Sequence, residues 1–210
     1  VLVASDRGLC GRYNTHMPRA AEAFIRPQTG DRQIELTLVG RKGGDHFRRR
    51  GAKIADRYID ILYKAADELA GEIAQKLISR FVGGEVDAVY ILYSRFRSAL
   101  SQVPTLEKLL PVALAESHEV QAQQQTEYLY EPGVEQLLAS LLPRITGVAV
   151  QRALLEATAS EHGARMTAME SATGNASKMI GSLTLQMNRA RQASITRELL
   201  EIVGTAEALK

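Results

Sequence analysis

The C-terminal third of the chain carries one long helical pattern of apolar positions. Residues 144–210 contain no proline, and from residue 162 onward apolar and small residues recur at alternating steps of four and three. This spacing averages about 3.5 residues, so the stripe stays on one face only if the helix winds left-handedly around a partner. A helix over the whole segment would be about 100 Å long, because each residue adds about 1.5 Å. We call the following set the seam: His162, Met166, Met169, Thr173, Ala176, Ile180, Leu183, Met187, Ala190 and Ser194.

The seam is only moderately apolar. Its Met and Ile residues alternate with Ala, Thr and Ser, whereas a self-sufficient two-stranded coiled coil favours Leu and Ile throughout. Small residues let a second helix approach closely, and Met adapts to irregular surroundings. One alternative is a long helix of an ordinary bundle, but no other stretch of this sequence is long enough to pair with it. The pattern therefore predicts a partner elsewhere and a mechanical or scaffolding role.

Residues 1 to about 130 show a different pattern, in which short β-like runs alternate with amphipathic helical stretches. The predicted strands are residues 1–4, 34–39, 53–55 and 88–93, with weaker candidates at 103–110 and 127–130; the predicted helices are 17–25, 45–50 and 65–81. In the last of these, one apolar face is formed by residues that recur every four positions: Leu69, Ile73, Leu77 and Phe81. Strands that alternate with helices are typical of an α/β fold with a mainly parallel sheet covered by helices.

Glycine and proline suggest where these elements end. The pair Gly43-Gly44 is predicted to separate two elements. Pro143 is expected to kink the long helix near its base. From the change in pattern we predict a foot domain over residues 1–131 and a shaft helix over residues 132–210.

The overall composition narrows the classes of function. Apolar residues make up 45% and charged residues 24%, and no run of 18 apolar residues occurs, which argues against a membrane-spanning helix. The formal net charge of +2 is too small to indicate nucleic acid or anionic lipid by itself. The single cysteine, Cys10, rules out an internal disulfide framework and fits a reducing compartment. The sequence opens with Val-Leu-Val, which is typical of a buried strand, so we expect an N-terminal piece to precede it.

A glycine-containing turn follows the first predicted strand. A strand, such a turn and a helix often form a phosphate site in α/β folds. Here, however, the spacing Gly8-x-x-Gly11 is neither the dinucleotide nor the P-loop fingerprint. Cys10 has Asp6 and His16 nearby in sequence, but this proximity does not fix a catalytic geometry, and a packed turn cysteine is the better interpretation. We therefore expect no cofactor.

Neither the histidines nor the basic stretch indicates a specific ligand. The four histidines lack the spacing of metal ligands, so no metal site is predicted. His162 lies on the seam, where we expect it to be packed or bonded to a partner. Basic residues gather between positions 41 and 57 and would suit phosphates. Because Phe47 is the only interleaved aromatic residue in this stretch, a solvated helix face is the better interpretation.

The end of the long helix changes from polar to apolar. Residues 189–198 mix arginine, glutamine, serine, threonine and glutamate. A helix that is polar on nearly every side is unusual unless it runs through a polar or aqueous channel. Residues 199–203 are mainly apolar again, which is consistent with a tip that meets a hydrophobic collar.

Four motifs along the chain resemble one known family. Residues 5–11 (Ser-Asp-Arg-Gly-Leu-Cys-Gly) and 190–199 (Ala-Arg-Gln-Ala-Ser-Ile-Thr-Arg-Glu-Leu) look like segments of the gamma subunit of F-type ATP synthases. Residues 166–176 resemble the mid-shaft segment of that family, and residues 128–132 (Tyr-Leu-Tyr-Glu-Pro) resemble its entry into the C-terminal helix. The motifs span the chain in the family's order, which makes the resemblance specific.

The resemblance implies a rotor that catalyses nothing itself. In the family, two long antiparallel helices form a shaft inside a hexamer of alpha and beta subunits, and proton flow turns this shaft. A Rossmann-like domain braces its foot beside the epsilon subunit and the c-ring. We therefore expect an α/β, Rossmann-like small domain with a very long C-terminal helix that forms half of an antiparallel coiled coil.

The resemblance also implies partners and a location. The expected partners are the alpha, beta and epsilon subunits and the c-ring in a hetero-oligomer, with no nucleic acid and no cofactor. Such a complex would hold the chain as a peripheral protein on the cytoplasmic face of a bacterial inner membrane or, alternatively, on the matrix face of the mitochondrial inner membrane.

Individual residues match positions at which family members make contacts. The hexamer contacts are expected at Arg165, Arg191, Gln192, Thr196 and Glu198. The foot contacts to epsilon and the c-ring are expected at Tyr128, Tyr130 and Glu131. Arg165 would face an acidic segment of the beta subunit, where a cation is electrostatically favourable.

The sequence departs from the family in one respect, since the family's N-terminal helix is absent from it. We expect that this helix is truncated or carried elsewhere, and that it is the missing partner of the seam.

Two other functions stay open. One is an α/β enzyme with a coiled-coil dimerisation tail, supported by the Gly8-x-x-Gly11 turn; the other is a nucleic-acid binder that uses the basic stretch. The rotor ranks first.

Overall fold

The computed structural model describes residues 1–28, 30, 32–60, 66–112, 131 and 133–208. It divides into two units, Val1–Thr167 and Ala168–Lys210, which we call the sheet unit and the C-terminal unit. The strand predicted at 127–130 lies outside the described residues. The predicted boundary between a foot and a shaft at residue 131 stays a prediction, because the division into units falls within the long helix.

Five strands form the sheet, in the order β3-β2-β1-β4-β5. They are β1 (Leu2–Val3), β2 (Leu36–Val39), β3 (Ile54–Tyr58), β4 (Val89–Phe96) and β5 (Gln102–Leu110). The first four are parallel, with Leu2 opposite Leu38 on one side and Leu92 on the other. β5 runs antiparallel to β4. The prediction of a mainly parallel sheet is confirmed, and the weak candidate at 103–110 corresponds to β5.

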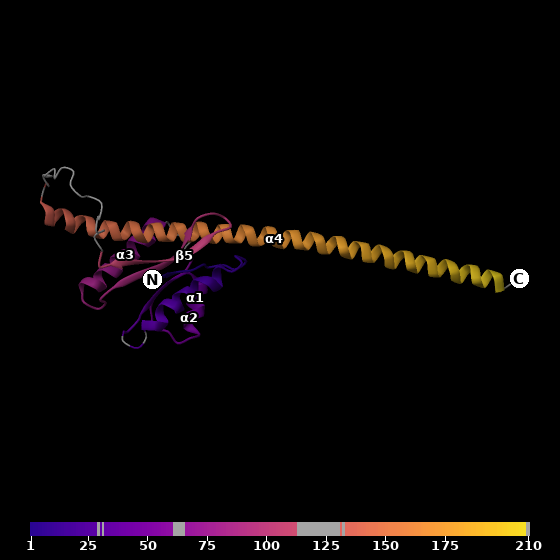
Figure 1. Ribbon diagram of the computed structural model, residues 1–210, viewed down its shortest axis with the longest axis horizontal. Helices are drawn as coiled ribbons and strands as arrows, with labels where there is room; N and C mark the ends of the chain where they lie inside the picture. Colours follow the sequence, from indigo (N-terminus) through magenta and orange to yellow (C-terminus); the bar gives the residue numbers. More distant parts are fainter. Residues whose placement is uncertain (29, 31, 61–65, 113–130, 132, 209–210) are drawn as a thin grey trace. The chain divides into compact units, whose positions relative to one another are not determined.

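Helices cover both faces of this sheet (Figure 1). α1 (Tyr13–Ile25) and α2 (Arg41–Arg48) lie on one face, and a short 3-10 helix, η1 (Arg26–Gln28), follows α1. α3 (Ala66–Val82) and the part of α4 (Val134–Ala208) that belongs to the sheet unit lie on the other face. The strands are therefore buried on both sides, which explains their nearly continuous apolar runs.

Alternate residues of the central strands enter two separate cores. Leu2 and Leu38 pack with residues of α1 and α2, whereas Val3 and Val39 pack with residues of α3 and α4. Each such side chain contributes about 1.5–3 kcal/mol when it is fully buried. The α4 residues of the second core are Val150, Ala153, Leu154 and Ala157, and their steps of three and four place them on one helix face.

Helix α2 differs from the prediction. It spans Arg41–Arg48 instead of residues 45–50, and the pair Gly43-Gly44, predicted to separate elements, lies buried inside it. A Cβ atom on Gly43 would lie 3.0 Å from the Cβ of Ala4, and one on Gly44 would overlap the Arg57 guanidinium. The glycines therefore serve close packing of α2 on the sheet, which outweighs their poor helix propensity.

Helix α1 begins at Tyr13, four residues before its predicted start, whereas α3 follows the pattern of the sequence. In α3, Leu69, Ile73 and Leu77 are buried, as their spacing predicted, and Phe81 packs against the same core while partly exposed. α4 continues as one helix past Pro143. The strand predicted at 53–55 is longer than expected, since β3 continues to Tyr58 through its pairing with β2.

Candidate functional site

The site suggested by the topology is the carboxyl edge of the sheet between β1 and β4. The chain runs from β1 through β2 to β3 on one side and then crosses to β4 and β5 on the other. In open α/β sheets, ligands bind outside the carboxyl ends of the strands where the strand order reverses in this way. The turn after β1 and the loop after β4 lie at this point.

Helix α4 lies against this edge. The Ser160 hydroxyl donates a hydrogen bond to the Ser94 carbonyl in β4 at 2.9 Å, and the Thr167 hydroxyl lies 3.1 Å from the Ala99 carbonyl. A Cβ atom on Gly163 would lie 3.1 Å from Cε2 of Phe96 and 3.2 Å from the Cα of Ala99. The chain's own helix thus covers the edge at which a doubly wound fold takes its ligand.

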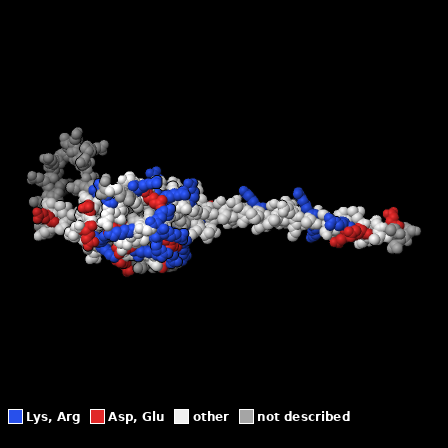
Figure 2. All heavy atoms as spheres, turned by 90° about the horizontal axis from the view of Figure 1, so that it is seen from below, with Lys and Arg blue, Asp and Glu red and all other residues white. Residues whose placement is uncertain are grey.

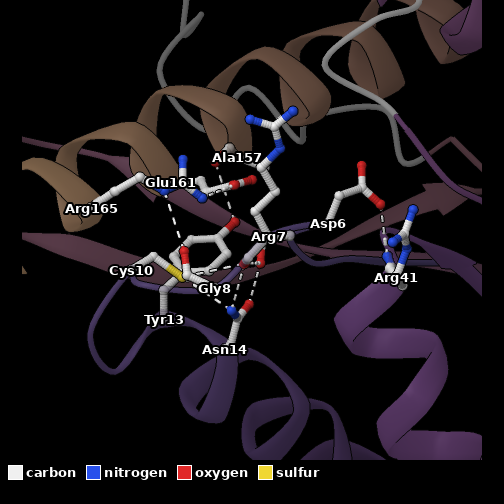
Figure 3. A network of polar contacts seen from close by, with 11 residues as sticks. Asp6, Arg7, Gly8, Cys10, Tyr13, Asn14, Arg41, Ala157, Glu161 and Arg165 are labelled. Atoms are coloured by element: carbon white, nitrogen blue, oxygen red, sulfur yellow. Dashed lines mark hydrogen bonds and ion pairs between the residues drawn. The ribbon is translucent and has the colours of Figure 1, made fainter.

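The turn after β1 is joined to α4 by a small polar network (Figure 3). Nε of Arg165 donates to the Gly8 carbonyl at 3.3 Å, and the Tyr13 hydroxyl donates to the Ala157 carbonyl at 3.2 Å. Arg165 also pairs with Glu161 at 2.5 Å. Glu161 is buried, and a buried carboxylate needs such a partner. We call these five residues, Gly8, Tyr13, Ala157, Glu161 and Arg165, the clasp.

The turn itself is held by its own polar side chains. The carbonyl of Arg7 accepts hydrogen bonds from the Ser5 hydroxyl at 2.8 Å and from the Asn14 amide at 2.9 Å. The Asn14 amide also lies 3.1 Å from Sγ of Cys10. Leu9 adopts a positive φ of 62°, which is uncommon for a residue with a side chain. These groups therefore shape the turn.

Burial raises the pKa values of two side chains under the turn, the thiol of Cys10 and the phenol of Tyr13. Cys10 is buried, and burial is the main cause that raises the pKa of its thiol above the ordinary value. Burial likewise raises the pKa of the Tyr13 phenol. A raised thiol pKa leaves little thiolate at neutral pH, and the thiolate is the reactive form. The interpretation of Cys10 as a packed turn cysteine is confirmed.

Asp6 has a role at the start of α2. Its Oδ1 accepts a hydrogen bond from the backbone N–H of Arg41 at 2.9 Å, and the N–H of Lys42 donates to the Ser5 carbonyl at 2.9 Å. Both are first-turn N–H groups of a helix, which have no partner within the helix itself. The turn after β1 therefore also fixes α2.

The structure places the predicted hexamer contacts in two different settings. Arg165 belongs to the clasp, where its side chain is 22% exposed. The other four lie in the C-terminal unit and are exposed: Arg191, Gln192, Thr196 and Glu198. Their hydrogen bonds are local, with the Thr196 hydroxyl donating to the Gln192 carbonyl at 2.8 Å and Ser194 to Glu198 at 3.2 Å.

The predicted foot contacts are only partly visible. Glu131 is described and exposed, whereas Tyr128 and Tyr130 lie outside the described residues. The clasp residues Tyr13, Ala157 and Glu161 were not found by sequence reasoning. The one signal available was the spacing of four between Glu161 and Arg165, which suits an ion pair on a helix.

The seam is exposed throughout the C-terminal unit. Met169, Ile180, Leu183 and Met187 have between 43% and 65% of their surface accessible. His162, in the sheet unit, is exposed as well, so its predicted packing is not found among the described residues. These residues have the spacing of an interface, but nothing in the described chain covers them.

The described part of the chain offers neither a metal site nor a membrane-spanning helix. Within it, no group of three or more His, Cys, Asp or Glu residues is arranged to hold a metal ion. The same residues include no helix that combines the length and the apolar character needed to cross a membrane.

Comparison with known sequences identifies the family to which this chain is similar. A family model described as ATP synthase matches residues 1–209. The ATP synthase gamma chain of Syntrophobacter fumaroxidans is 46% identical, and that of Geobacter metallireducens is 48% identical. Each match covers 100% of this chain and 72% of the relative.

Solved structures show the same fold. A chain of the central stalk and c-ring of Tetrahymena thermophila mitochondrial ATP synthase matches with a TM-score of 0.62 at 26% identity, covering 81% of this chain and 74% of that one. A chain of Euglena gracilis mitochondrial ATP synthase matches with a TM-score of 0.69 at 21% identity, covering 99% and 71%. With the family model and the sequence identities, these matches show that the chain belongs to the ATP synthase gamma chain family.

Proposed function

We propose that this chain is the central-stalk rotor subunit of an F-type ATP synthase. In this role it couples proton flow through the membrane sector to ATP synthesis at the alpha/beta hexamer by rotating. One observation carries the proposal: a member of the gamma chain family leaves the apolar seam of its longest helix exposed. Exposed apolar residues that recur every 3.5 residues are typical of a helix that works against partners.

A second helix packs along the seam in this proposal, antiparallel to α4, to complete a coiled coil. The small residues Ala176 and Ala190 allow that helix to approach closely, and the Met residues accommodate an irregular fit. The shaft helix then extends from residue 132 and the foot from residue 1 to 131. Burial of the exposed Met, Ile and Leu side chains supplies the stability that this part of α4 lacks alone.

The hexamer contacts lie on the other side of the same helix. Successive helical residues are turned by about 100°, so positions two apart are turned by about 200°. Gln192 lies two residues after the seam residue Ala190, and Thr196 lies two residues after the seam residue Ser194. A partner on the seam therefore leaves Gln192 and Thr196 free to face the hexamer, while Arg191 and Glu198 border both surfaces.

The clasp supports a non-catalytic, load-bearing role. Its hydrogen bonds and those of Ser160 and Thr167 tie α4 to the sheet at the edge where an α/β enzyme would hold its substrate. Because Arg165 is 22% exposed, an acidic group of the beta subunit can reach one of its N–H groups while Glu161 holds another. We therefore keep Arg165 among the proposed hexamer contacts and assign no catalytic residue.

The remaining assignments concern the foot. Tyr128, Tyr130 and Glu131 are proposed to contact epsilon and the c-ring. The Syntrophobacter and Geobacter relatives are bacterial, which favours the cytoplasmic face of a bacterial inner membrane, with attachment through the complex.

Co-expression with alpha and beta subunits tests the proposal. We expect the chain, within its full-length protein, to co-purify with both subunits in one complex. We further expect the double variant Arg191→Ala with Gln192→Ala to lower ATP-driven proton pumping while hydrolysis by the complex persists. A matched control is Arg32→Ala with Gln33→Ala, which also removes one guanidinium and one amide from adjacent exposed positions, but in the sheet unit. Failure to co-purify would contradict the assignment as a rotor subunit. Unchanged pumping in the double variant would contradict the proposed hexamer contacts.

A further inference from the structure

We propose that a pocket between α1, α2 and the starts of β2 and β3 binds a small anionic amphiphile. The ligand class is a molecule with one short apolar chain and one phosphate or carboxylate group. The inference concerns the face of the sheet opposite to α3 and α4 and is independent of the rotor function.

The floor of the pocket is apolar. Its volume is about 690 Å³, within the range of about 300–1,000 Å³ that small-molecule sites occupy. Phe47 and Leu36 are buried core residues, and Ile25 and Ile34 pack against the same core from the pocket side. The pocket is thus an open part of the α1–α2 core. An apolar chain placed in it would extend that core and remove these side chains from water.

The rim of the pocket is strongly basic. Figure 2, which views the side of the sheet unit where α1 and α2 lie, shows Lys and Arg side chains gathered over part of this surface. Five cations line the pocket against a single carboxylate, Glu22: Arg19, Arg26, Arg32, Arg50 and Lys53. An apolar floor with a rim of one sign of charge attracts and orients a ligand of the opposite sign.

Most of this positive charge is not neutralised. Glu22 already accepts from His46 at 2.7 Å and pairs with Arg50 at 2.8 Å, and Lys53 pairs with Glu35. The three other arginines of the rim are Arg19, Arg26 and Arg32. Within the part of the chain that the structure describes, their guanidinium groups make no ion pair and no hydrogen bond. Guanidinium forks bind phosphate and carboxylate groups bidentately. The rim therefore offers unused donors for one such group.

The combination of floor and rim selects the ligand class. Inorganic phosphate would use the rim alone, and a neutral amphiphile would use the floor alone. Single-stranded nucleic acid binds through exposed aromatic side chains on which bases stack, whereas Phe47, the aromatic residue of this pocket, is buried. An anionic amphiphile uses both features.

Titration calorimetry of the full chain with octyl phosphate below its micellar concentration tests the proposal. We expect one-to-one binding that is at least about tenfold tighter than that of octyl glucoside or of inorganic phosphate, and that weakens as salt rises. Equal affinities for octyl phosphate and octyl glucoside would overturn the proposal. So would binding only to phosphatidylglycerol vesicles, which would indicate a membrane surface, or only to an acidic apolar peptide, which would indicate a protein partner.

Two variants locate the binding. Arg19→Glu, Arg26→Glu and Arg32→Glu together should weaken octyl phosphate at least about tenfold, because the donors are lost and like charges replace them. Ala23→Trp should also abolish binding, since Ala23 is an exposed lining residue and its replacement fills the pocket without changing any charge. The matched control reverses three exposed charges of the C-terminal unit, with Lys178→Glu, Arg189→Glu and Arg197→Glu. If the control weakens binding and the pocket variants do not, octyl phosphate binds the exposed seam and the proposal is wrong.

Discussion

Helix α4 contains two segments with similar helical patterns and opposite environments. Between Thr146 and Thr167 its apolar face is buried against the sheet, with Val150 and Leu154 almost inaccessible. From Ala168 onward its apolar residues are exposed, including Leu183 and Met187. The first segment packs against other parts of the chain, whereas no described residue covers the second.

The difference lies in what each face can contact. The buried segment uses steps of three and four and places Ala153, Ala157 and Gly163 where the sheet comes close. The seam uses the same steps but alternates Met and Ile with small residues over a greater length, which suits a second helix better than a twisted sheet. Both segments are therefore helical, but among the described residues only the first is stabilised by packing against the sheet.

The largest contrast is expected from two adjacent leucines. Leu154 is 1% exposed and Leu155 is 52% exposed. Leu154→Ala should lower the free energy of unfolding of the sheet unit by about 2–5 kcal/mol, because it leaves a cavity in the α3–α4 core. Leu155→Ala should change it by less than about 0.5 kcal/mol. All seven tyrosines precede residue 131 and the chain has no tryptophan, so urea unfolding followed by tyrosine fluorescence reports the sheet unit. Equal effects of the two variants would contradict the assigned burial.

Two predicted contact arginines provide the next contrast. Arg165→Met removes the partner of the buried Glu161 carboxylate and should cost about 1–3 kcal/mol, less than for a fully buried pair because Arg165 is partly exposed. Arg191→Met should change the unfolding of the sheet unit by less than about 0.5 kcal/mol. Adding Glu161→Gln to Arg165→Met should recover part of the loss in the same urea experiment. A loss that Glu161→Gln deepens would mean that the pair does not hold the clasp.

Two glycines of α4 test the close approach. Gly163→Val places a side chain against Phe96 and Ala99 and should cost about 1–3 kcal/mol through overpacking. A Cβ atom on Gly174 would meet no neighbouring atom within 4 Å, so Gly174→Val should leave the sheet unit unchanged and slightly favour helix, since valine has a higher helix propensity than glycine. Tyrosine fluorescence measures the first effect and far-ultraviolet circular dichroism the second. If Gly163→Val leaves the free energy of unfolding unchanged, the segment between β4 and β5 moves aside for the added side chain at little cost.

Part of this arrangement could be predicted from local patterns. The run Leu-Thr-Leu-Val of β2 and the four-residue spacing of Leu69, Ile73 and Leu77 each bury a continuous apolar surface, so the strand and the helix follow from the residues alone. The length of α4 follows in the same way. The parallel sheet followed from the alternation of strands and helices.

The clasp could not be predicted in this way. The hydrogen bond between Tyr13 and Ala157 joins residues 144 positions apart, and that between Arg165 and Gly8 joins residues 157 positions apart. Such contacts depend on how α4 packs, and no local pattern encodes them. The error at Gly43-Gly44 has the same origin, because close packing on the sheet outweighed the usual meaning of a glycine pair.

The smallest contrast separates two threonines that share one local contact. Thr167 and Thr196 each have a hydroxyl within hydrogen-bond distance of the carbonyl four residues earlier, but only Thr167 also lies 3.1 Å from the Ala99 carbonyl. Thr167→Val should therefore cost the sheet unit about 0.5–1.5 kcal/mol, the usual net value of one hydrogen bond, and Thr196→Val should cost it nothing measurable. The comparison uses the urea midpoint at constant slope, so that a change in stability is distinguished from a change in the unfolded state. If both variants leave the midpoint unchanged, the Thr167 hydroxyl bonds only within its own helix, and the contacts of α4 with the rest of the sheet unit end at Arg165.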